Sequence, residues 1–161
     1  MSLRERVRQI NSDTEETQRL NAHSLSDWLT DLKGLYGFVE KFIEKRLSEE
    51  LRKGLVKVSR TPVQRYEESL GQYQTEELNF SLAGRVVVFS PVALRVIGSF
   101  GRVDVFLRGR IDQGFMILRA ERMPARWAIL QKSERRKLGH TPKPQPLSED
   151  SLDHAIESLL Q

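Results

Sequence analysis

The sequence predicts an α+β fold, in which a long amphipathic helix packs on a curved antiparallel meander of about five strands and a short helix ends the chain. Three patterns predict it: an apolar stripe of helical period over residues 25–51, apolar and polar residues alternating over residues 76–132, and a shorter helical stripe near the C-terminus. With 161 residues, 39% of them hydrophobic, the chain is long enough for one domain with its own core.

The first predicted unit is an N-terminal helical arm over residues 1–22, followed by a single α+β domain over residues 23–161. The heptad positions of the arm are apolar only in its first half: Leu3, Val7 and Ile10, then Thr14, Thr17 and Asn21. This pattern is compatible with a coiled-coil contact to another copy and equally with a frayed terminal segment.

The long helix is predicted to begin at Leu25 and to end near Lys53. Ser24 and Asp27 have the spacing of an N-terminal capping pair, and Gly54 is suited to the left-handed residue that follows a helix. The apolar residues between these ends recur at steps of three and four, so one face of the helix is expected to cover the sheet.

Two glycines, Gly34 and Gly37, interrupt this helix at a cost of about 0.5–1 kcal/mol each relative to alanine. One explanation is the close approach of another backbone, from the sheet or from a second copy. The other is a kink or break that divides the segment into two helices. The sequence favours neither.

The strands are predicted from alternation and from turn residues. We expect a short edge strand at residues 55–60, a surface connection at residues 65–74, and a long strand that bends at a bulge formed by Ala83 and Gly84. Four more strands are expected at residues 92–97, 102–110, 115–121 and 126–132.

The C-terminal region combines a proline-rich linker and a helix. Residues 139–146 contain three prolines and are expected to be extended and semi-rigid. Ser148 is the expected N-cap, with Leu147 and Leu152 on either side as a hydrophobic staple. The helix that follows is expected to dock on the domain or on a partner.

No motif for catalysis, metal binding or cofactor binding is present. The absence of cysteine excludes disulfides and thiolate chemistry, and the three histidines lack partners at metal-ligand spacing, apart from His154 with Glu157, a pair common on solvated helices. We therefore predict no enzymatic activity, no metal and no cofactor. No apolar run is long enough to cross a bilayer and no signal peptide is visible, so we expect a cytoplasmic protein without membrane contact.

The positive charge lies in the predicted sheet. Residues 84–137 carry 12 Lys and Arg against 4 Asp and Glu, whereas the flanking segments are slightly negative. If Val103, Val105 and Leu107 face the core, the alternate residues face away from it. The candidate binding residues on and beyond that face are Arg102, Phe106, Arg108, Arg110, Arg119, Arg126, Arg135 and Arg136.

Three functions remain open from the sequence. The first is a protein-interaction or assembly module that forms a homodimer, because the apolar face of the long helix and the arm exceed what one sheet face covers. The second is nucleic-acid binding, because an exposed aromatic ring between arginines can stack on a base while the arginines contact phosphates. The third is a small-molecule site or enzyme with a pocket on the curved sheet. A solvated arginine face, or one that meets an acidic protein, is an alternative to the second.

Overall fold

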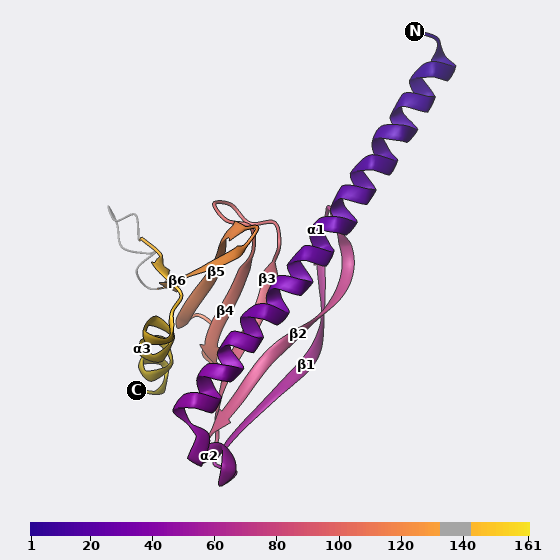
Figure 1. Cartoon of the computed structure of the whole chain (residues 1–161). Coiled ribbons are helices and arrows are strands. Elements are labelled where there is room, and N and C mark those ends of the chain that lie inside the picture. The colour runs from indigo at the N-terminus through magenta and orange to yellow at the C-terminus, as the bar shows by residue number, and fades with distance from the viewer. Residues whose placement is uncertain (133–142) are drawn as a thin grey trace.

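A long helix lies diagonally across one face of an antiparallel sheet in the computed structural model, which describes residues 1–132 and 143–161 (Figure 1). The predicted α+β class is confirmed, with seven strands where about five were expected. The elements in chain order are α1 (Leu3–Arg46), α2 (Ser48–Arg52), β1 (Val56–Glu67), β2 (Gly71–Leu82), β3 (Arg85–Ala93), β4 (Arg102–Leu107), β5 (Gly114–Arg122), β6 (Ala125–Gln131), β7 (Gln145–Pro146) and α3 (Glu149–Leu160).

The sheet is a meander in which each strand pairs antiparallel with its neighbours in the chain, in the order β1-β2-β3-β4-β5-β6-β7. Sequential hairpins of this kind need only short connections. In the described residues no helix has an apolar run long enough to cross a membrane.

The chain reverses at Ala83 and Gly84, so the predicted bulge within one long strand is wrong. Both residues have positive φ, 48° and 84°, and Leu82 pairs with Arg85 on either side of them. Two consecutive residues with positive φ make the two-residue turn that matches the twist of a β-hairpin. The alternation of apolar and polar residues changes phase at this point because the chain turns here from β2 into β3.

The predicted surface connection at residues 65–74 is also wrong, because it is the tip of a hairpin whose strands β1 and β2 are twelve residues long. Glu67 pairs with Gly71 across the turn, and Gly71 has a φ of +73°. Most residues of β1 are exposed on this edge strand, so little burial imposed an alternating pattern on its sequence.

The strand β3 continues through Ser90 and Pro91 to Ala93, and residues 94–101 form a loop in place of the predicted strand at residues 92–97. The register with β4 shifts between Pro91 and Ala93, a bulge at which proline is tolerated in a sheet. β4 ends at Leu107, earlier than predicted.

The arm and the long helix form one continuous helix, α1, so the predicted start at Leu25 with Ser24 as cap is wrong. The N-cap is Ser2, whose hydroxyl accepts from the Glu5 amide while the Glu5 carboxylate accepts from the Ser2 amide. The prediction for Gly54 is confirmed, since its φ is +74° after the short helix α2.

Gly34 and Gly37 neither break α1 nor accept a close backbone. A Cβ built at either position meets nothing within 4 Å. Among the described residues no other backbone approaches these glycines, and α1 is unbroken at both, so neither a close backbone contact nor a division into two helices explains them. Gly34 lines a groove described below.

The core lies between α1, α3 and one face of the sheet. Along α1 its members follow the helical period: Trp28, Leu32, Leu35, Tyr36, Val39, Phe42 and Ile43. They pack with residues from the strands and with Leu152, Ala155 and Ile156 of α3 in one cluster. Burial of such large side chains is the main favourable term in the stability of the fold.

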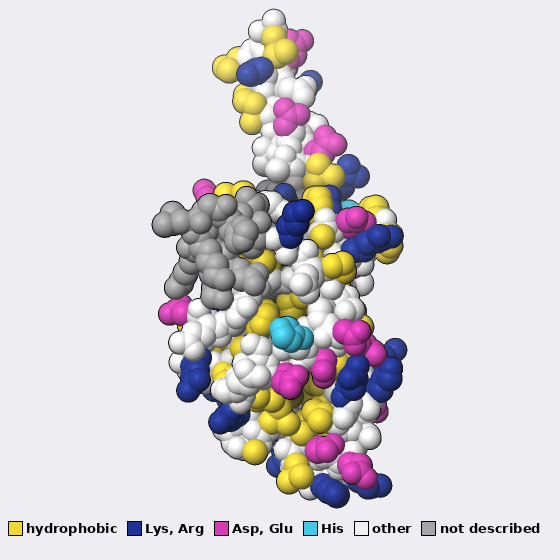
Figure 2. Space-filling model, turned by 90° about the vertical axis from the view of Figure 1, so that its left-hand side faces the viewer, with side chains coloured by type: hydrophobic (Ala, Val, Ile, Leu, Met, Phe, Trp, Pro, Cys, Tyr) yellow, Lys and Arg dark blue, Asp and Glu magenta, His cyan; other side chains and the backbone are white. Residues whose placement is uncertain are grey.

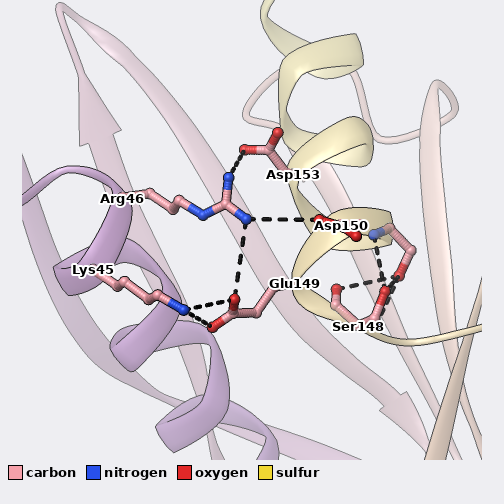
Figure 3. Close-up of polar contacts among 7 residues, drawn as sticks. Lys45, Arg46, Ser148, Glu149, Asp150 and Asp153 are labelled. Atoms are coloured by element: carbon pink, nitrogen blue, oxygen red, sulfur yellow. Dashed lines mark hydrogen bonds and ion pairs between the residues drawn. The ribbon is translucent and has the colours of Figure 1, made fainter.

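Ion pairs join the C-terminal end of α1 to the N-terminal end of α3 (Figure 3). Lys45 Nζ lies 3.0 Å from Glu149 Oε2, and Arg46 lies between Glu149, Asp150 and Asp153 at 3.7–4.0 Å. The acidic first turn of α3 and the basic last turn of α1 also match their helix dipoles.

The predicted N-cap of α3 is confirmed, because the Ser148 hydroxyl accepts from the Ser151 amide. The predicted proline-rich linker falls partly outside the described residues, at positions 139–142. Its end is the short strand β7, which adds Gln145 and Pro146 to the edge of β6.

Candidate interaction surface

The N-terminal part of α1 extends beyond the sheet as a free arm. Every residue from position 1 to position 20 is exposed, and the arm projects from the body of the molecule in Figures 1 and 2. Its first polar contacts with the domain are at Asn21, whose side chain donates to the Ser69 carbonyl at 3.0 Å and accepts from Arg95 at 2.9 Å. We call residues 1–20 the arm from here on.

Three aliphatic side chains of the arm form a stripe in solvent. Leu3, Val7 and Ile10 are 82%, 57% and 55% exposed, values typical of surface lysines. Figure 2 shows hydrophobic side chains along the arm. Three large aliphatic residues at heptad spacing on an unpacked helix make this stripe a candidate contact surface.

This stripe points in the same direction as the core-facing side of α1. Eighteen residues make five turns of an α-helix, so Val7 and Ile10 lie above Leu25 and Trp28 on one line. Leu25 and Trp28 pack against the sheet, while the sheet ends below the arm. The arm therefore continues an apolar face for which the described part of the chain supplies no partner.

The arm is helical without tertiary packing. It is held by the cap at Ser2 and by bonds one turn apart, from Gln9 to Asp13 at 2.9 Å and from Asn11 to Glu15 at 3.3 Å. Most of the stability of helices in proteins comes from the packing of an apolar face and little from helix propensity. Contact with a partner helix would supply that packing.

The second predicted surface is the outer face of β4. Its side chains point away from the core as predicted, but the aromatic ring on it is not exposed. Val103, Val105 and Leu107 belong to the core, so Arg102 and Phe106 lie on the opposite face of the sheet as expected. The prediction of an exposed aromatic ring is wrong, because Phe106 is only 8% exposed.

The neighbours of Phe106 explain its burial. It pairs with Val88 of the adjacent strand, and the Lys132 ammonium lies 5.9 Å from the centre of its ring. Large side chains on the neighbouring strands cover an aromatic ring on a sheet face even where no helix packs on it. Without an open ring face this position has no platform on which a base could stack.

The carboxylate of Asp104 holds the neighbouring cations. Arg102 Nε lies 2.8 Å from Asp104 Oδ1, and Lys132 Nζ lies 2.9 Å from Oδ2. Asp104 is 6% exposed, and this network is therefore a local structural feature of the sheet. It reduces the field that Arg102 presents to solvent.

Arg119 lies inside the protein, which contradicts its prediction as a surface binding residue. Its side chain has no exposed area and bonds to Asp31 of α1 at 2.5 Å and to the Phe100 carbonyl at 2.8 and 3.0 Å. The guanidinium also lies 5.0 Å from the centre of the Trp28 ring. The reason is the alternation of side chains along β5: Arg119 is two residues after Ile117 and so lies on the same face of the sheet, and Ile117 is buried in the core.

The remaining candidate arginines do not form one patch. Arg108 and Arg110 are exposed at the turn after β4, whereas Arg126 is exposed near the opposite end of β5, 3.4 Å from Glu121. Arg135 and Arg136 lie outside the described residues. The predicted arginine surface is therefore divided between two ends of the sheet.

An apolar groove lies between α1 and the start of β6, and has a volume of about 640 Å³. The missing side chain of Gly34 leaves space at its floor, between Phe38, Trp127 and Leu147. No signal in the sequence identified this groove, since its walls come from segments about 90 residues apart. Across residues 1–132 and 143–161, no group of three or more His, Asp or Glu residues could hold a metal ion.

Comparison with models of protein families, with curated proteins and with solved structures gave no match to this chain.

Proposed function

We propose that this chain is a non-catalytic assembly module that forms a homodimer through its N-terminal arm. The observation that supports the proposal is the exposure of Leu3, Val7 and Ile10 on a helix that stands clear of its own domain. A stripe at heptad spacing is matched best by another helix with the same stripe, which a second copy supplies.

The size of the stripe sets the expected strength of the contact. A symmetric pair of arms brings together six aliphatic side chains, and each contributes about 1.5 kcal/mol or more when fully buried. Association itself costs several kcal/mol in lost translational and rotational freedom. The dimer is therefore expected to be reversible and to depend on protein concentration.

Nucleic-acid binding has less support than it had from the sequence. Phe106 is buried and Arg102 is paired with Asp104, so among the described candidates the exposed arginines Arg108, Arg110 and Arg126 remain, and only Arg108 and Arg110 lie close together in the chain. Loss of a salt-dependent oligonucleotide shift in the variant Arg108→Glu/Arg110→Glu would support this alternative.

Two matched variants of the full chain test self-association. Val7→Gln/Ile10→Gln removes the aliphatic stripe and keeps a residue of good helix propensity at both positions. Ser12→Gln/Glu16→Gln places the same residue twice on the opposite side of the arm. Sedimentation velocity over a hundredfold range of concentration measures the monomer and dimer populations of each.

We expect the wild-type chain and the Ser12→Gln/Glu16→Gln control to dimerise with rising concentration, and Val7→Gln/Ile10→Gln to stay monomeric. The far-ultraviolet circular dichroism of the domain should be retained in both variants, because all four positions are exposed. A wild-type chain that stays monomeric throughout would overturn the proposal. If Val7→Gln/Ile10→Gln dimerises as strongly as the wild type, the interface does not involve the arm and the proposal is wrong on this point.

A further inference from the structure

The sheet restricts how two arms can pair. From Leu25 onward, the face of α1 that carries the arm's stripe is covered by the sheet of the same chain. A parallel partner lying on the stripe would run into this sheet one to two turns below the arm, and the partner's sheet would meet α1 in the same way. An antiparallel partner continues past the tip of the arm, away from every element that the structure describes (Figure 1).

The charges of the arm favour the same direction. Its first ten residues carry Arg4, Arg6 and Arg8 against Glu5, a net charge of +2, and its next ten carry Asp13, Glu15 and Glu16 against Arg19, a net charge of −2. Antiparallel pairing places each positive half beside a negative half, whereas parallel pairing places like charges together.

We propose that the arms of two copies pair antiparallel, with residue 8 of one opposite residue 9 of the other. This inference rests on the proposed self-association and specifies its geometry. Each residue i then lies opposite residue 17−i of the partner. Val7 packs against the partner's Ile10 in two central layers, and Leu3 packs against the methyl-bearing side of the partner's Thr14 in two outer layers.

This register also pairs the flanking charges. In an antiparallel coiled coil, the positions that precede the first core residue of each heptad lie beside one another. Here they are Arg6 and the partner's Asp13, which meet twice by symmetry. Arg4 lies beside the partner's Asn11 on the other flank. In the described structure Arg6 makes no ion pair of its own, and the carboxylate of Asp13 accepts only from the Gln9 side-chain amide, at 2.9 Å.

Arg6 and Asp13 are seven residues apart, about two turns, so they cannot pair within one helix. A charge reversal at either position therefore changes contacts between chains and few within a chain. The variant Arg6→Asp places two aspartates opposite each other in both flanking pairs, and Asp13→Arg places two arginines there. An equimolar mixture of the two variants restores both pairs as heterodimers.

Sedimentation equilibrium at low salt provides the test. We expect each variant alone to dimerise about tenfold or more weakly than wild type. The 1:1 mixture and the double variant Arg6→Asp/Asp13→Arg should recover near wild-type dimerisation. If the mixture dimerises no better than its components while wild type dimerises, the proposed geometry is wrong and the proposed function stands. A wild-type monomer contradicts both.

Cysteine cross-linking gives an independent test, since the chain contains no cysteine. An oxidised mixture of Leu3→Cys and Thr14→Cys chains should form a mixed disulfide, because the two positions face each other. Leu3→Cys alone should not cross-link, because its partner copy lies 11 residues away along the axis, about 16 Å. Rapid cross-linking of Leu3→Cys alone would indicate parallel arms and overturn the inference.

Discussion

Removing the carboxylate of Asp31 should destabilise the fold far more than an average surface substitution. Asp31 is the anionic partner of Arg119, whose side chain has no exposed area. In Asp31→Ala the guanidinium keeps the Phe100 carbonyl and the Trp28 ring as neighbours but loses its counter-charge. A buried ion that loses its partner costs about 3–5 kcal/mol.

The reverse substitution should cost less, because the two partners differ in their access to water. The Asp31 side chain is 26% exposed, and it can be hydrated when Arg119 is replaced by methionine, which fills a similar volume. The expected loss for Arg119→Met is about 1–3 kcal/mol, mainly from the unpaired Phe100 carbonyl. The difference between the variants measures the burial of the guanidinium charge.

Urea unfolding of both variants, followed by circular dichroism, measures the two free energies. For a chain of this size, 1 kcal/mol corresponds to about 2–4 °C in Tm, so Asp31→Ala should melt about 6–20 °C below wild type. A double variant, Asp31→Leu/Arg119→Met, should recover much of the loss, because it leaves no buried charge. A larger loss in Arg119→Met than in Asp31→Ala would refute this reasoning.

Four further predictions concern packing and ionisation. Gly101→Ala should destabilise the fold by about 1–3 kcal/mol, because its Cβ would lie 2.2 Å from the Trp28 ring. In the same urea assay, Gly34→Ala should stabilise the fold by about 0.5–1 kcal/mol, since its Cβ meets nothing within 4 Å. Burial raises the pKa of Tyr36 above its unfolded value near 10, so the folded state resists ionisation of this phenol. The contribution of Tyr36 to the unfolding free energy should therefore be constant below about pH 10 and fall above it, and the fall measured by urea unfolding should be less steep in Tyr36→Phe. Leu152→Ala should lower the unfolding free energy by about 2–5 kcal/mol, since Leu152 is fully buried. A thermal melting midpoint equal to that of the wild type would contradict this prediction.

The fold class could be predicted because an element with one buried and one exposed side has apolar residues that recur with the period of a helix or a strand. Val103 and Val105 alternate with residues of the outer face, and Leu32, Leu35 and Val39 repeat on the buried face of α1. β1 lies at an edge with most of its residues exposed, so its sequence is free of that constraint and its full length was not predicted.

The candidate site was predicted in part for the same reason. The heptad spacing of Leu3, Val7 and Ile10 is local and can be read from the sequence. The environment of Arg119 depends on Asp31, which is 88 residues away in the sequence. No local sequence pattern reveals a contact between residues so far apart in the chain. Its parity with Ile117 on β5 was the one available sign that this arginine faces the core.

The polar residues of the arm explain why α1 leaves the domain where it does. Thr14 and Thr17 occupy the positions that Leu32 and Leu35 occupy five turns later, and their hydroxyls donate to carbonyls of the preceding turn at 2.8 and 2.9 Å. A stripe of leucines there would be an aggregation hazard on a free helix, whereas threonines keep the arm hydrated next to the sheet. Along this stripe, large aliphatic residues return only at Ile10, Val7 and Leu3, beyond the end of the sheet. This separation of two apolar segments by a polar one is expected of a helix that anchors in its own domain at one end and meets another chain at the other.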